Sequence, residues 1–107
     1  MNKEMKICPV KFFTKKLGGK WKLSIIYNLR NRSLRFGQLA VIIDGISRKV
    51  LTDQLNQMEI DGLINRKSYK ESPPRVEYSL TKSSLDLIPL FAKIDDWVGL
   101  HSINRDS

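Results

Sequence analysis

One stretch decides the fold: residues 43–80 read IDGISRKVLTDQLNQMEIDGLINRKSYKESPPRVEYSL. The first half predicts a helix over 47–61, because leucine and methionine recur on one side at helical spacing. We expect the serine at its start to cap this helix and Gly62 to end it. The second half predicts two short strands, 64–69 and 75–80, joined by a proline-tipped turn.

The side of the predicted helix opposite the apolar stripe is polar. On a helical wheel this face holds Lys49, Thr52, Asp53, Asn56 and Gln57, with Arg48 beside it. Hydrogen-bonding side chains with cations at the leading end are typical of a helix that reads base edges in the major groove of DNA. Taken alone, the helix fits an ordinary solvated face somewhat better than a base-reading one.

The predicted hairpin is basic. Its cations are Arg66, Lys67, Lys70 and Arg75, against Glu71 at the tip. Such cations can reach the sugar-phosphate backbone or the minor groove of a duplex. Lysine and proline also protect an edge strand from unwanted pairing, which is the structural alternative. A polar-faced helix, a glycine and a basic hairpin in succession favour a reader of duplex DNA over either alternative.

The rest of the chain is expected to form helices around this unit. Apolar spacing and a helix-opening proline predict helices over about 8–17, 20–31, 36–43 and 82–100. The segment 33–35 is too short to stand alone, and we expect it to pair with the hairpin as a strand. Thr81 is expected to cap the last helix, and Pro89 to kink it. The predicted fold class is therefore mainly α with a small β-hairpin, in one domain over 1–107.

The last predicted helix carries a wider apolar stripe than a single domain of this length needs to bury. The stripe consists of Leu87, Leu90, Phe91, Ile94, Trp97 and Val98. We expect it to form a subunit interface, because a twofold dimer would place two reading helices about one DNA turn apart. The alternative is that this helix only covers the core of its own chain.

Composition restricts the partner. The 107 residues hold 19 Lys and Arg against 11 Asp and Glu, which leaves a formal net charge of +8. So basic a chain is expected to bind a polyanion, and we expect double-stranded DNA rather than an anionic membrane. No apolar run approaches the roughly 20 residues of a membrane span. Residues 1–6 lead into no signal-peptide core, and we therefore expect a cytoplasmic protein.

The sequence shows no arrangement of catalytic or metal-binding residues. One cysteine and one histidine are too few for a zinc site of the usual kind, so we expect no metal and no cofactor. No nucleophile, base and orienting group occur together, and no glycine-rich phosphate loop follows a strand. We therefore expect the protein not to be an enzyme.

Several motifs, taken in order, resemble a known family. They are CPV at 8–10, GGKW at 18–21, RFGQL at 35–39, GIS at 45–47, LT at 51–52, DGL at 61–63 and PPRVEYSLT at 73–81. Together they resemble the HxlR-type transcriptional regulators, which are related to the MarR group. The resemblance implies a winged helix-turn-helix homodimer, with dimer contacts from the helices over 8–17 and 82–100. It also implies a recognition helix over 47–61 in the major groove and a wing over 64–80.

These inferences define the expected DNA contacts. In the groove we expect Ser47, Arg48, Lys49, Thr52 and Asn56, and on the backbone or in the minor groove Arg66, Lys67, Lys70 and Arg75. The leading interpretation is a sequence-specific transcriptional regulator with a palindromic operator. The alternative is a winged-helix module that binds an acidic protein partner instead of specific DNA. The sequence identifies no small-molecule effector.

Cys8 lies at the start of the first predicted helix. The positive end of the helix dipole, with Lys6 and Lys11 nearby, favours the thiolate, which is the reactive form. Members of the resembled family with a cysteine at this place include sensors of oxidants or electrophiles, which implies a redox role for Cys8. The alternative is a small helix-opening residue without a signalling role.

Overall fold

Helices surround a three-stranded antiparallel sheet in the computed structural model, which describes residues 7–102. The elements are α1 Pro9–Leu17, α2 Lys22–Asn28, β1 Leu34–Arg35, α3 Phe36–Ile42, α4 Arg48–Ile60, β2 Ile64–Tyr69, β3 Arg75–Leu80, α5 Lys82–Leu85 and α6 Ile88–His101. The predicted fold class, mainly α with a small sheet, is confirmed. Lys6 and the rest of the segment 1–6 lie outside the described residues.

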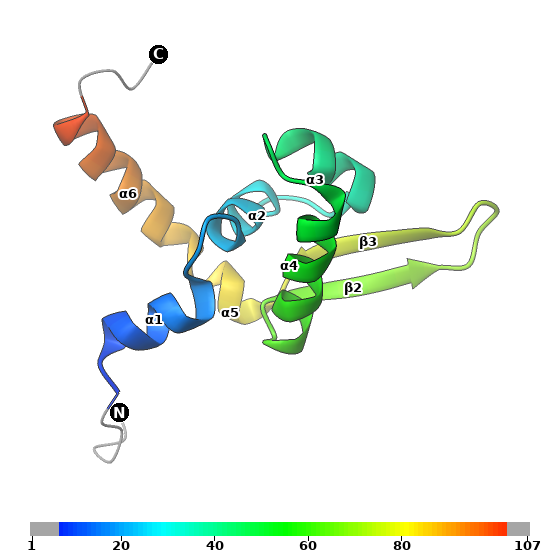
Figure 1. Cartoon of the computed structure of the whole chain (residues 1–107), viewed down its shortest axis with the longest axis horizontal. Coiled ribbons are helices and arrows are strands. Elements are labelled where there is room, and N and C mark those ends of the chain that lie inside the picture. Colours follow the sequence, from blue (N-terminus) through cyan, green and yellow to red (C-terminus); the bar gives the residue numbers. More distant parts are fainter. Residues whose placement is uncertain (1–6, 103–107) are drawn as a thin grey trace.

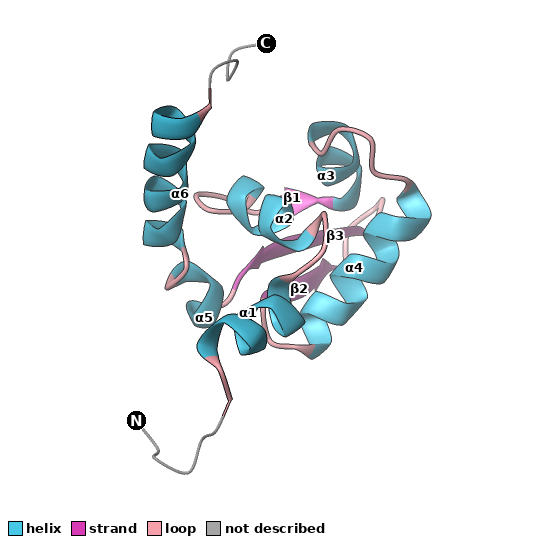
Figure 2. Ribbon diagram, turned by 60° about the vertical axis from the view of Figure 1, so that its left-hand side comes forward, coloured by secondary structure: helices cyan, strands magenta, loops and turns pink. Residues whose placement is uncertain are grey.

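The elements are arranged with the hairpin on one side and the terminal helices on the other. In Figure 1 the β2–β3 hairpin extends to the right, while α1 and α6 diverge on the left. Figure 2 shows α4 and α6 on opposite sides of the sheet. Across residues 7–102 no helix combines the length and the apolar character that crossing a membrane requires.

Helix α4 begins and ends where the sequence indicates. The Ser47 hydroxyl accepts a hydrogen bond from the Val50 backbone N–H at 3.1 Å, which satisfies a donor of the first turn. Gly62 has φ of +73°, a left-handed conformation that glycine adopts without a steric penalty. The predicted apolar stripe is buried: Leu51, Leu55 and Met58. Its burial turns the polar face of α4 outward.

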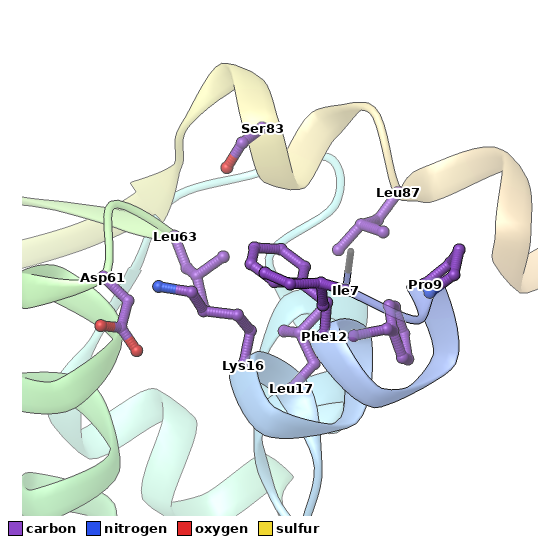
Figure 3. A pocket seen from close by; sticks show the side chains of 10 residues that line it. Ile7, Pro9, Phe12, Lys16, Leu17, Asp61, Leu63, Ser83 and Leu87 are labelled. Atoms are coloured by element: carbon purple, nitrogen blue, oxygen red, sulfur yellow. The ribbon is translucent and has the colours of Figure 1, made fainter. Parts of the chain in front are cut away.

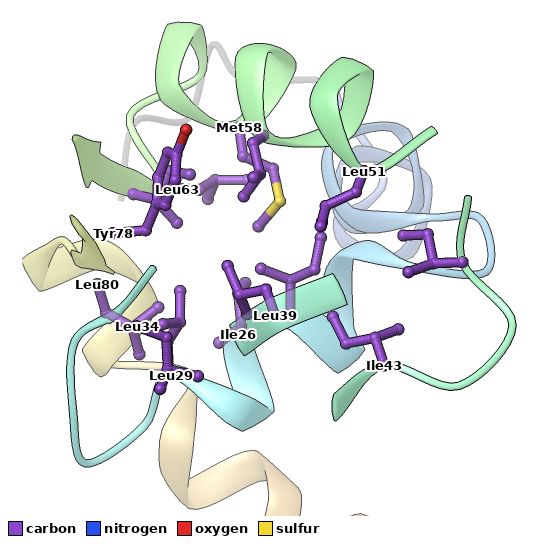
Figure 4. Close-up of a cluster of buried hydrophobic side chains, with 14 of the residues drawn as sticks. Ile26, Leu29, Leu34, Leu39, Ile43, Leu51, Met58, Leu63, Tyr78 and Leu80 are labelled. Carbon is purple, nitrogen blue, oxygen red and sulfur yellow. The ribbon is translucent and has the colours of Figure 1, made fainter. Parts of the chain in front are cut away.

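The hydrophobic core lies between the helices and the sheet, as Figure 4 shows. Its most deeply buried apolar members are Ile25, Ile26, Leu29, Leu39, Leu51, Leu55 and Met58. Tyr78 and Leu80 close the core from β3. Trp21, Phe36 and Ala40 are partly buried and pack against this core.

The sheet has the strand order β1-β3-β2. The expected pairing of 33–35 with the hairpin is confirmed, because Leu34 lies opposite Tyr78 and Arg35 opposite Glu77. On the other side of β3, the strand β2 pairs with it from Ile64 to Tyr69. The helix-turn-helix formed by α3 and α4 therefore leads directly into a wing that is part of the same sheet.

The second helix is shorter than the sequence predicts, spanning Lys22–Asn28 instead of 20–31. Two arginine side chains that follow the helix bond to carbonyl groups at its end. Arg30 donates to the Tyr27 carbonyl at 2.7 Å, and Arg32 donates to the Asn28 carbonyl at 3.1 Å. These side chains bind carbonyl groups that further helical turns would otherwise have used.

The segment predicted as one last helix forms two helices, α5 and α6. Pro89 has no N–H and cannot continue the hydrogen-bond ladder of α5, but it is favourable in the first turn of α6. The prediction of one continuous helix over 82–100 was therefore wrong at this point. Thr81 occupies the N-cap position of α5 as expected, but its side chain accepts no hydrogen bond from the helix, and its hydroxyl donates to the Gly62 carbonyl at 2.7 Å.

Helix α5 is hydrogen-bonded to the loop that follows α4. The buried Ser84 hydroxyl donates to the Leu63 carbonyl at 2.6 Å. Together with the Thr81 bond to Gly62, this contact fixes the start of the C-terminal segment against the start of the wing. The position of α6 relative to α4 therefore depends on a short, hydrogen-bonded connection.

The core placement of α3 predicts a difference between two of its apolar residues. Leu39→Ala should lower the free energy of unfolding by about 2–5 kcal/mol, because it removes a fully buried side chain and leaves a cavity. Val41→Ala on the same helix is the control, since Val41 is 83% exposed. Urea denaturation followed by circular dichroism measures both. Similar losses in the two variants would contradict the placement of α3.

Candidate nucleic-acid interface

The predicted groove residues lie on one exposed face of α4. Exposed side chains on this face are Ser47, Arg48, Lys49, Thr52, Asp53, Asn56 and Gln57. The first turn carries Arg48 and Lys49 and no acidic residue. Cations at a helix N-terminus oppose the helix dipole, so this arrangement does not favour helix stability. It does favour the approach of an anion, because the dipole and the cations then act together.

Contacts on this face orient several of its side chains. The Arg48 guanidinium stacks on the Phe36 ring, with its carbon 4.8 Å from the ring centre. The Thr52 hydroxyl donates to the Arg48 carbonyl at 2.9 Å, and its oxygen still has the capacity to accept. Lys49 Nζ lies 3.5 Å from Asp53 Oδ2. Arg48 is thus held beside the start of α3, while Lys49 and Asp53 form a pair on the polar face.

The wing carries exposed cations on β2 and at its tip. Arg66, Lys67 and Lys70 are exposed. Lys67 lies over the Tyr69 ring, with Nζ 5.0 Å from the ring centre. Only residues 61–63 separate α4 from β2, so the wing begins next to the end of the polar-faced helix. The structure thus brings the predicted groove residues and wing cations into neighbouring elements.

Arg75 differs from the other wing cations. It is 33% exposed and lies 3.2 Å from Glu71 Oε1. Its Nε is 3.3 Å from Glu77 Oε2, an ion pair that lacks hydrogen-bond geometry. Its guanidinium also stacks 4.0 Å from the centre of the Tyr69 ring. These contacts stabilise the pairing of the two strands. A DNA contact from Arg75 stays a prediction, and in it a phosphate would compete with two carboxylates for the guanidinium.

The terminal helices, which lie on the side of the molecule away from the wing (Figure 1), expose apolar side chains. On α6 the exposed fractions are 37% for Leu90, 41% for Ile94, 64% for Trp97 and 79% for Leu100. On or beside α1 they are 49% for Ile7, 69% for Val10 and 48% for Phe12. Exposed apolar side chains on two helices at the same side of the molecule are typical of a protein-protein contact surface.

The predicted interface stripe divides into two groups. Leu87 and Phe91 pack against the core of their own chain, and the Phe91 ring meets Tyr27 edge-on at 5.2 Å between centres. Leu90, Ile94 and Trp97 are exposed, and Val98 is half-buried. The structure therefore places half of the predicted stripe outward. Phe91 holds α6 to α2 through this ring contact.

A cavity of about 550 Å³ lies between α1, α5 and the loop after α4. Figure 3 shows its lining, which is mostly apolar and includes Phe12, Leu17 and Leu87. Lys16 and Asp61 are the charged residues that line it. No pattern in the sequence indicates this cavity, because the cavity depends on how α1 lies against α5. It adjoins the exposed apolar surface of α1.

Cys8 is exposed at the N-terminus of α1. It lines a depression with Lys11, Lys15 and Lys16 among its neighbours. Exposure and an electropositive setting are the two conditions that a reactive thiol requires. Of the two lysines expected near Cys8, Lys11 is confirmed in this setting.

Within residues 7–102 no three His, Cys, Asp or Glu side chains gather as a metal site would require. His101 lies in the last turn of α6, with its ring centre 5.0 Å from that of Trp97.

The sequence analysis placed Asp53 on the polar face of the helix but did not include it among the predicted DNA contacts. The four-residue spacing from Lys49 was the sequence signal that could have paired the two residues.

The structure is similar to solved structures of transcriptional regulators. A protein from Porphyromonas gingivalis W83 assigned to the MarR family superposes with a TM-score of 0.83 at 39% identity, covering 92% of this chain and 96% of that one. The redox regulator HypR in its oxidized form superposes with a TM-score of 0.81 at 37% identity, covering 94% and 100%. The predicted winged helix-turn-helix is thereby confirmed.

Sequence comparison identifies the family. The uncharacterized HTH-type transcriptional regulator YdeP of Bacillus subtilis is 40% identical over 90 residues, which are 84% of this chain and 70% of that protein. The profile of the HxlR-like helix-turn-helix family matches residues 16–106. The chain therefore belongs to the HxlR-like family of MarR-related transcriptional regulators.

Proposed function

We propose that this regulator binds a specific DNA sequence as a homodimer, with α4 in the major groove and the β2–β3 wing on the backbone or in the minor groove. The observation that carries the proposal is the exposed polar face of α4, with Arg48 and Lys49 in its first turn, beside a basic hairpin. The net charge of +8 favours a polyanionic partner. Membership of a helix-turn-helix family supports the same partner.

The two elements have different tasks in this proposal. Ser47, Lys49, Thr52 and Asn56 approach base edges, and the Asn56 amide can bond adenine through two atoms. Arg48, held against Phe36 at the edge of α4, contacts phosphate or guanine. Arg66, Lys67 and Lys70 neutralise phosphates and so set the position of the protein on the duplex. Arg75 keeps the wing in shape through its contacts with Glu71 and Glu77.

The homodimer forms through α1 and α6 in this proposal. Both helices expose apolar side chains, and both lie on the opposite side of the molecule from the wing. An interface there leaves α4 and the wing of each copy accessible. A twofold arrangement then presents two recognition helices to successive turns of one duplex, which fits a palindromic operator.

Base contacts and phosphate contacts should respond differently to substitution. Asn56→Ala should lose about 1–3 kcal/mol of discrimination between the selected duplex and random duplexes, because it removes a base contact. Lys70→Ala should weaken binding to all duplexes alike and reduce the slope of log affinity against log salt by about 1. Selection from random duplexes, followed by gel-shift titration at several salt concentrations, measures both effects.

Two outcomes would contradict this assignment. An equal loss on selected and random DNA for Asn56→Ala would remove its role in base reading. A wild-type protein with neither a preferred duplex nor a salt-dependent affinity would instead be a winged-helix module that binds proteins.

The dimer proposal makes a prediction about Trp97. Trp97→Lys should produce monomers, because two copies of the introduced charge would face each other across a twofold interface. Helix α6 contains no buried residue, so we expect the variant to remain folded. Val41→Lys is the control, since Val41 is 83% exposed on α3, away from α1 and α6. Sedimentation velocity gives the oligomeric state, and dimers of both variants would rule out α6 as the interface.

We further propose that Cys8 makes DNA binding sensitive to oxidants. The thiol is exposed among lysines, and the similar HypR is named a redox regulator. Because each chain has one cysteine, the disulfide formed links two copies through Cys8 or joins Cys8 to a small thiol. When diamide is the oxidant, two thiols lose two hydrogens, the S–S bond forms, and diamide takes up both hydrogens.

Oxidation should therefore change the affinity for the selected duplex in the wild type and not in Cys8→Ser. The serine variant keeps the size and the helix-opening position of the residue but cannot form a disulfide. Gel-shift titration before and after diamide measures the response, and non-reducing electrophoresis identifies the product. The same response in both proteins would show that Cys8 has no part in it.

A further inference from the structure

The recognition face of α4 carries a carboxylate beside a cation. Lys49 Nζ lies 3.5 Å from Asp53 Oδ2, and the two side chains are 86% and 55% exposed. Residues four positions apart lie on the same face of a helix, one turn from each other. The pair therefore points outward together with Thr52 and Asn56.

Helix stability does not account for this pair. The order is cation first and acid four residues later, which stabilises a helix less than the reverse order. Lys49 also lies in the first turn, where the helix dipole disfavours a cation. Both side chains are largely exposed, and exposed ion pairs contribute little to stability.

Phosphate binding does not account for Asp53 either. A carboxylate on a DNA-facing surface repels phosphates and lowers the affinity for every duplex. It gains a favourable partner only at a base edge that presents a hydrogen-bond donor. In the major groove the exocyclic amino group of cytosine is such a donor, and aspartate is one of the side chains that accept from it.

The paired side chains complement a G·C edge. Guanine presents the acceptors O6 and N7, which lysine binds, beside the cytosine N4 amino donor, which aspartate binds. Thymine offers no donor in the major groove, so a T in place of this cytosine would leave Asp53 without a hydrogen bond from the base at that position. A Lys-Asp pair thus selects for one base pair and also penalises others.

We infer that Lys49 and Asp53 read one G·C base pair in each operator half-site. Lys49 donates to guanine, and Asp53 accepts from the N4 amino group of the paired cytosine. This inference rests on the proposed function, since it requires the polar face of α4 to lie in the major groove. It adds Asp53 as a specificity-determining residue.

The test compares two variants that remove one negative charge from α4. In Asp53→Asn the preferred base at one position of each half-site should change from cytosine to adenine, because asparagine bonds adenine through two atoms. Discrimination in favour of the original cytosine should fall about tenfold or more. Glu59→Gln is the control, because Glu59 is also exposed but lies about 120° around the helix from Asp53.

Selection from random duplexes is carried out for the wild type and both variants, as full-length proteins. The expected result is one altered position per half-site for Asp53→Asn and an unchanged site for Glu59→Gln. An unchanged site in Asp53→Asn, or the same change in both variants, would overturn the inference. So would a wild-type site in which the altered position is adenine.

The wild-type selection separates this inference from the proposed function. If the wild type selects no sequence at all, the proposed function itself fails, and the base-reading role of Asp53 fails with it. If the wild type selects a palindrome that Asp53→Asn leaves unaltered, only the role of Asp53 is wrong.

Discussion

The burial of Leu51, Leu55 and Met58 is the constraint on which the rest of the structure depends. Because these side chains lie on one side of α4, the helix can pack against the core in only one rotation, and its polar face must point outward. The Ser47 cap fixes where the helix starts. The left-handed Gly62 fixes where the chain turns into the wing. A face suited to reading bases is thus a consequence of core packing.

The same turn also positions the C-terminal segment. The carbonyls of Gly62 and Leu63 accept hydrogen bonds from the hydroxyls of Thr81 and Ser84, so the end of α4 and the start of α5 share one small structural unit. Beyond it, α6 is held to the body through the contact of Phe91 with Tyr27. Helix α6 is therefore linked both to the turn between α4 and the wing, through α5, and to α2, through Phe91.

Local patterns made much of this structure predictable, and tertiary contacts account for what was missed. The bounds of α4, β2 and β3 follow from spacing, a cap and a glycine, all of which act within a few residues. The early end of α2 depends on the side chains of Arg30 and Arg32, which reach back to its carbonyls. The bracing of Arg75 requires Glu71, Glu77 and Tyr69 to be brought together by the hairpin, and spacing alone could not show this.

Net charge alone is a poor guide to how many phosphates such a protein neutralises. Several of the 19 Lys and Arg side chains are engaged within the chain. Arg30 and Arg32 bond carbonyls of α2, Arg75 lies between two glutamates, and Lys82 pairs with Asp86 at 2.9 Å. The exposed cations of the first turn of α4 and of the wing are concentrated in two adjoining elements. Since electrostatic attraction between exposed groups falls off within about one Debye length, roughly 8 Å at physiological salt, the placement of these cations determines binding more than the total charge does.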